Sequence, residues 1–110
     1  MSLQHKSLDE GRWAQFTFLE QMANIGSEVE RALIWKTKQN TLYSQKAFER
    51  ALELIDLTLA EQSTMPRLKE LARVREVIVD YFFGTNEYST TDVFLRKYFS
   101  AFIFTARKHY

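Results

Sequence analysis

Residues 66–83 read PRLKELARVREVIVDYFF, and this stretch decides the fold class of the chain. Its apolar residues recur at steps of three and four, which is the period of an α-helix with one apolar face. They are Leu68, Leu71, Val74, Ile78, Val79 and Phe82. Pro66 suits the first turn of a helix, and Gly84 can adopt the left-handed conformation of a C-terminal cap. The stretch therefore predicts an amphipathic helix over 66–83 that must pack against other elements.

Arg75 lies inside this apolar face, between Leu68 and Phe82. A buried guanidinium needs a carboxylate, because an unpaired buried charge costs several kcal/mol or more. Glu30 falls inside a second apolar face, so we expect Glu30 and Arg75 to form a buried structural ion pair that sets the helix register. Two alternatives remain open. The pair could be the polar floor of a small-molecule pocket, or Arg75 could extend its charged end to solvent.

Three further stretches have the helical period: 12–39, 43–61 and the segment that follows Ser89 and ends near Lys108. Nothing resembling the alternation of a strand competes with this pattern. Gly26 lies on the inner face of the first stretch. We expect it to permit a close helix crossing, and the alternative is a kink at Asn24, Ile25 and Gly26.

We therefore expect an all-α protein, an up-and-down four-helix bundle in a single domain. The bundle should occupy residues 12–110, after a flexible tail at 1–11. Ser89 and Asp92 have the spacing of a capping box, which would begin the last helix.

The composition excludes several classes of function. A chain of 110 residues with a net charge of +1 gives no global electrostatic argument for binding nucleic acid or an anionic membrane. The absence of cysteine removes disulfides and thiol chemistry. No apolar run approaches about 20 residues, and the start lacks the features of a secretory signal, so we expect a cytoplasmic protein with no membrane association.

No catalytic or metal-binding constellation is visible in the sequence. The histidines, His5 and His109, stand near the two ends of the sequence, and spacing places neither beside a candidate serine or carboxylate as a nucleophile–base pair. The acidic residues of the second and third helices are expected to point outward as a solvated charge ladder: Glu49, Glu53, Asp56, Glu76 and Asp80. We therefore expect no enzymatic activity, no cofactor and no metal.

The outer face of the last helix carries a basic strip, made of Arg96, Lys97, Ser100, Phe104, Arg107 and Lys108. Basic residues around an exposed ring can contact phosphates and a base, but they are also typical of protein interfaces or of a solvated face. Sixteen aromatic residues are present, ten of them after residue 80. These rings exceed what one small core can bury, so we expect a homodimer.

The segment 43–54, YSQKAFERALEL, resembles the second helix of HEPN-type bundles, with a tyrosine at the turn and alanines at helical steps. HEPN proteins are small bacterial and archaeal all-α proteins, and the resemblance implies a nucleotidyltransferase as partner. Their ribonuclease members carry an R-x4–6-H motif. This chain lacks it, because the corresponding positions before His109 are Phe102, Ile103 and Phe104.

Together these features predict a non-enzymatic helical interaction module that self-associates and binds a protein partner. Two alternatives are a nucleic-acid-associated module that uses the basic strip and a bundle that binds a small ligand between its helices.

Overall fold

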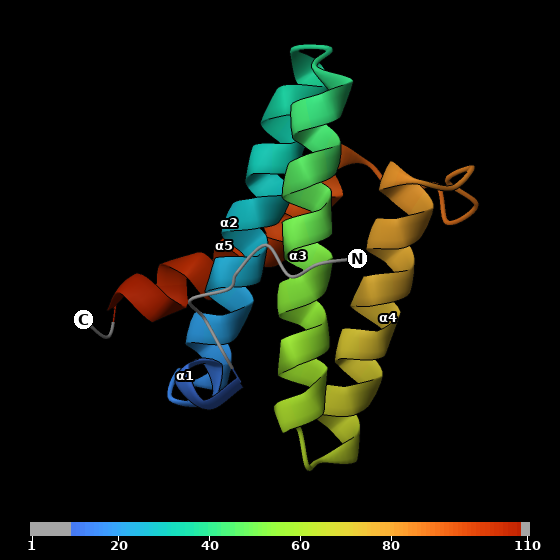
Figure 1. Ribbon diagram of the computed structural model, residues 1–110. Helices are drawn as coiled ribbons and strands as arrows, with labels where there is room; N and C mark the ends of the chain where they lie inside the picture. Colours follow the sequence, from blue (N-terminus) through green and yellow to red (C-terminus); the bar gives the residue numbers. More distant parts are fainter. Residues whose placement is uncertain (1–9, 109–110) are drawn as a thin grey trace.

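The computed structural model describes residues 10–108, which form an all-α structure without strands (Figure 1). The all-α prediction is confirmed. The helices are α1 (Glu10–Ala14), α2 (Phe18–Thr37), α3 (Thr41–Glu61), α4 (Met65–Phe82) and α5 (Asp92–Lys108). Most of the tail predicted for 1–11 lies outside the described residues, whereas Glu10 and Gly11 belong to α1.

The predicted helix over 12–39 is divided into α1 and α2 by a capping box. The Thr17 hydroxyl accepts a hydrogen bond from the Glu20 amide at 3.1 Å, and the Glu20 carboxylate accepts one from the Thr17 amide at 2.8 Å. A capping box satisfies free N–H groups at a helix start, so it favours a new helix here over a continuous one. The single-helix prediction was therefore wrong at this point.

The short helix α1 is held by the side chain of Trp13, which is almost fully buried. Its indole Nε1 donates to the Thr58 hydroxyl on α3 at 2.9 Å, and its carbonyl accepts from the Gln21 side chain at 2.9 Å. A buried indole N–H needs such a partner, since an unsatisfied buried donor costs about 1–3 kcal/mol. Trp13 thus attaches α1 to both α2 and α3.

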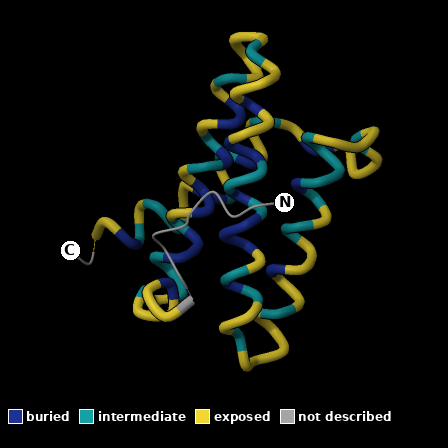
Figure 2. Tube along the Cα trace, viewed as in Figure 1, coloured by how far each residue is buried: buried dark blue, intermediate teal, exposed yellow. Residues whose placement is uncertain are grey.

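Helices α2 and α3 form an antiparallel hairpin at the centre of the molecule (Figure 1). The Ser44 hydroxyl donates to the Ala32 carbonyl at 2.8 Å, and the small residues Ala47 and Ala51 are fully buried. The two alanines of the segment 43–54 therefore pack in the core. Figure 2 shows buried residues concentrated along these two helices, with far fewer along α4.

Helix α5 lies behind α2 and packs obliquely along it (Figure 1), with Arg96 beside Glu30 and Arg107 near Glu20. The crossing point is Gly26, where an added Cβ atom would lie 2.8 Å from the Cβ of Phe99. Only glycine allows the two backbones to approach this closely. The close crossing predicted at Gly26 is confirmed. Residues 10–108 form five helices where four were predicted, so the all-α class is confirmed and the four-helix up-and-down order stays a prediction.

The loop between α4 and α5 differs from the sequence prediction. Gly84 does not adopt a positive φ, whereas Asn86 and Ser89 do, at 57° and 52°. The Asp80 carboxylate accepts hydrogen bonds from the amides of Glu87 and Tyr88, at 2.8 and 3.1 Å.

Ser89 is not the N-cap of α5. The Thr91 hydroxyl accepts the Phe94 amide at 3.1 Å and caps this helix instead. The predicted capping box of Ser89 and Asp92 was therefore wrong, because the left-handed backbone at Ser89 places that residue in the loop.

Candidate interaction surface

The predicted ion pair between Glu30 and Arg75 is not formed. Arg75 donates from Nε to Asp56 on α3 at 2.8 Å, and the two side chains are 40% and 53% exposed. The hydrogen bond to Asp56 raises the pKa of the Arg75 guanidinium above its ordinary value. The sequence correctly indicated that Arg75 needs a carboxylate, but both the partner and the degree of burial were wrong.

Glu30 is paired with Arg96 on α5, whose Nε lies 3.0 Å from the Glu30 carboxylate. The same guanidinium donates to Asp92 at 3.1 Å. The partners differ from the prediction because α5 packs against α2, whereas α4 packs against α3. Arg96 on α5 therefore lies beside Glu30, and Arg75 on α4 lies beside Asp56. Arg96 is thereby neutralised by two carboxylates.

The predicted basic strip is reduced by this pairing. Ser100 and Arg107 lie on the side of α5 that borders α2, while Phe104 points to solvent and is 70% exposed. The cations of the strip that remain exposed, without an ion pair to any described residue, are Lys97, Arg107 and Lys108. Three unpaired cations are a weak electrostatic basis for nucleic-acid binding, because affinity rises with the number of phosphates neutralised.

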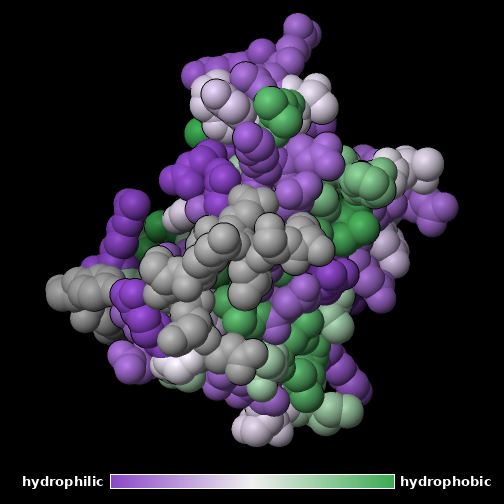
Figure 3. Space-filling view, viewed as in Figure 1, coloured by the Kyte–Doolittle hydropathy of each residue, from purple (hydrophilic) through white to green (hydrophobic). Residues whose placement is uncertain are grey.

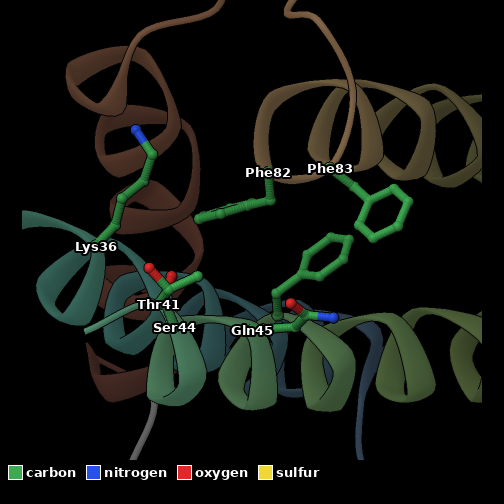
Figure 4. Close-up of a pocket in the computed structure, with 7 residues that line it drawn as sticks. Lys36, Thr41, Ser44, Gln45, Phe82 and Phe83 are labelled. Carbon is green, nitrogen blue, oxygen red and sulfur yellow. The ribbon is translucent and has the colours of Figure 1, made fainter. Parts of the chain in front are cut away.

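A mixed polar and aromatic pocket of about 180 Å³ lies where the ends of α2, α3 and α4 meet (Figure 4). Its lining residues are Lys36, Thr41, Ser44, Gln45, Phe48, Phe82 and Phe83. The Lys36 ammonium donates to the Tyr81 hydroxyl at 3.4 Å and lies 4.8 Å from the centre of that ring. The Ser44 hydroxyl donates its proton to the Ala32 carbonyl, so this proton is held by the backbone of α2 and not by a general base.

A predominantly apolar groove of about 170 Å³ opens between α4 and α5. We call it the α4–α5 groove. It is lined by Glu70, Arg73, Val74, Val77, Phe94, Leu95, Tyr98 and Phe99. The Val74 and Val77 side chains are only partly buried, and Phe94 is 56% exposed at the margin. Figure 3 also shows apolar side chains at the surface along α4.

One hydrogen bond spans the α4–α5 groove. The Tyr98 hydroxyl on α5 donates to the Glu70 carboxylate on α4 at 2.9 Å. Burial raises the pKa of the Tyr98 phenol above its ordinary value, and the bond to Glu70 raises it further. This bond connects two helices that otherwise make few contacts with each other.

Sequence reasoning missed the α4–α5 groove. Val74 belongs to the predicted apolar face of 66–83, yet it is only partly buried and lines the groove. The available signal was Val77, an apolar residue just beside the predicted apolar face, combined with the high aromatic content after residue 80. Including Val77 makes the predicted apolar face of the helix broader. The sequence does not show which part of that face the other helices leave exposed to solvent.

Other chemical sites are not evident in the described part of the chain. No group of three or more His, Asp or Glu residues there is arranged to hold a metal ion. None of the helices from α1 to α5 has the length and apolar character needed to span a membrane. His5 and His109 lie outside residues 10–108. Glu53, predicted to face solvent, is 3% exposed, because α1, α2 and α4 all pack around α3.

Comparison of the chain with protein-family models, with curated proteins and with solved structures finds no match.

Proposed function

We propose that this protein is a non-enzymatic helical interaction module that self-associates through the α4–α5 groove. The observation that supports this proposal is the apolar lining of the groove, which the helices of residues 10–108 leave open to solvent. Aromatic residues are enriched in protein interfaces, and the partly buried valines add apolar area beside the exposed Phe94 ring.

The energetic gain from covering this groove is substantial. A phenylalanine side chain buries about 150–250 Å² on full burial, and each Å² of apolar surface removed from water contributes roughly 25 cal/mol. Covering the exposed half of Phe94 together with Val77 therefore contributes on the order of 2–4 kcal/mol per copy. In a symmetric dimer the contribution counts twice, which is enough to offset part of the cost of association.

The basic strip of α5 is a less favourable surface for self-association. A two-fold contact there would bring Lys97, Arg107 and Lys108 against residues of the same sign, which opposes binding. The strip is better suited to an acidic partner or to nucleic acid. The nucleotidyltransferase implied by the HEPN resemblance is one such candidate for a second, heterologous contact.

Sedimentation velocity over a range of protein concentrations tests the proposal. The unaltered chain should form dimers, and Val77→Lys should be monomeric because it places a charge in the groove. Val93→Lys is the matched control, since Val93 is 63% exposed and does not line the groove. Circular dichroism should show that both variants keep the helical content of the parent.

Three results would overturn the proposal. The first is a monomer at high micromolar concentration, and the second is equal dimerisation of the Val77→Lys variant. The third is RNA affinity that falls steeply with salt and is lost in Lys97→Glu with Lys108→Glu, in a chain that stays monomeric. That result would establish the nucleic-acid alternative.

A further inference from the structure

We infer that the occupant of the α4–α5 groove is a second copy of the chain, bound with the two α4 helices antiparallel and with Glu70 of each copy paired to the partner's Arg73. This inference rests on the proposed function and specifies its partner, orientation and register.

The inference starts from the side chains on one face of α4. Pro66, Glu70, Arg73 and Val77 follow one another at steps of four, three and four, which places them on a common face. The first three are exposed and Val77 is partly buried. Glu70, Arg73 and Val77 also line the α4–α5 groove, so this face of α4 is one wall of the groove.

The charges on this face are complementary to a copy of themselves in one orientation only. In an antiparallel pair with the two-fold axis between Leu71 and Ala72, residue 70 of each copy lies opposite residue 73 of the other. The symmetry then produces the Glu70–Arg73 contact twice, as in any isologous interface. The same register places Val77 opposite the partner's Pro66. A parallel pair would instead put each charge opposite its own copy, which is repulsive.

Both charged groups are able to form this contact. The Tyr98 hydroxyl donates to Oε2 of Glu70, and a carboxylate has further acceptor positions on its other oxygen. Arg73 forms no ion pair with another residue of the described chain. It differs in this respect from Arg75 and Arg96, which are used within the monomer.

The location of the pair also matters for its strength. Exposed ion pairs contribute little, about 0–1 kcal/mol, whereas contacts that become desolvated at an interface have larger coupling energies. The second α4 would cover Glu70 and Arg73 beside the apolar groove. Specificity for the antiparallel register would thus come from the two charge pairs, and affinity mainly from Val77 and Phe94.

Charge reversal tests the register by sedimentation velocity on the full chain. Arg73→Glu and Glu70→Arg should each weaken dimerisation about tenfold or more. Each variant places two side chains of like charge opposite one another, and the two-fold symmetry repeats this repulsive contact. The double variant restores opposite charges and should return the dimer dissociation constant to within about threefold of the parent. Arg107→Glu is the matched control for a change of two charge units, and it should have no effect.

A Tyr98→Phe variant separates the interface contact from the internal bond. It removes the hydrogen bond to Glu70 without changing the charge on α4. Because Tyr98 itself lines the groove, the readout is the effect of Arg73→Glu in this background, which should weaken dimerisation by the same factor as in the parent, within about threefold. Loss of the Arg73→Glu effect in the Tyr98→Phe background would mean that Glu70 acts through the monomer, and it would overturn the inference.

The remaining outcomes are equally decisive. If the double variant is as monomeric as the single variants while Val77→Lys still disrupts the dimer, the register is wrong and the groove remains the interface. If the single reversals leave the dimer intact, the charge pairing is likewise overturned. If the unaltered chain never dimerises, both this inference and the proposed function fail.

Discussion

Replacing Gly26 by alanine should destabilise the protein, even though alanine favours helix formation. Gly26 lies within α2, and its ideal Cβ position is 2.8 Å from the Cβ of Phe99 and 3.1 Å from two atoms of that ring. The nearest atom is attached directly to the backbone of α5, so a rotamer change of the ring does not relieve the contact. The two helices must therefore separate.

Two opposing terms determine the size of the effect. Alanine is better than glycine in a helix by about 1 kcal/mol. Overpacking of a closely packed site costs about 1–3 kcal/mol, and a rigid neighbour places Gly26 near the upper end of that range. The free energy of unfolding of Gly26→Ala should therefore fall by roughly 1–2 kcal/mol.

Urea denaturation followed by far-ultraviolet circular dichroism measures this difference. For a urea dependence of roughly 1–2 kcal/mol per molar, the midpoint should decrease by about 1 M. Every variant must be compared at one protein concentration, because self-association would add to the apparent stability. Ser27→Ala, at the exposed neighbouring position, is the control and should change stability by less than about 0.5 kcal/mol. A Gly26→Ala protein as stable as the parent, or more stable, would refute the close crossing of α2 and α5.

Two further predictions follow from the contacts of α4. Arg75→Ala should reduce the free energy of unfolding by less than about 1 kcal/mol, because its ion pair with Asp56 is exposed. A double-mutant cycle with Asp56→Ala measures the coupling, and a value above about 2 kcal/mol would contradict this assignment. For Tyr98, the raised pKa means that the native state retains the phenol proton at pH values where the unfolded chain, with a pKa of about 10, has lost it. The free energy of unfolding should thus be insensitive to this group below pH 10 and fall as the pH rises above 10, with a smaller decrease in Tyr98→Phe. Denaturation at pH 9–11 with both proteins checks this, and identical slopes would contradict it.

The start of α2 was not predicted, although a local sequence pattern for it is present. The capping box of Thr17 and Glu20 is as clear in the sequence as the one proposed at Ser89 and Asp92, yet only the first is formed. A capping pattern states that a helix can begin at a residue. Whether it does begin there depends on the loop geometry, which Asp80 controls here by binding two loop amides.

The sequence by itself determined the secondary structure class and much of the core. The helical period of the apolar residues is a local property, and it correctly identified Leu71 and Ile78 as buried residues and Gly26 as a close contact. The identity of ion-pair partners and the position of the α4–α5 groove were decided only by the tertiary structure. Both depend on the angle at which α5 crosses α2 and on how far α4 is covered. A helix with an apolar face must pack against something, but its own pattern does not specify the direction, the partner or the part of the face that remains open.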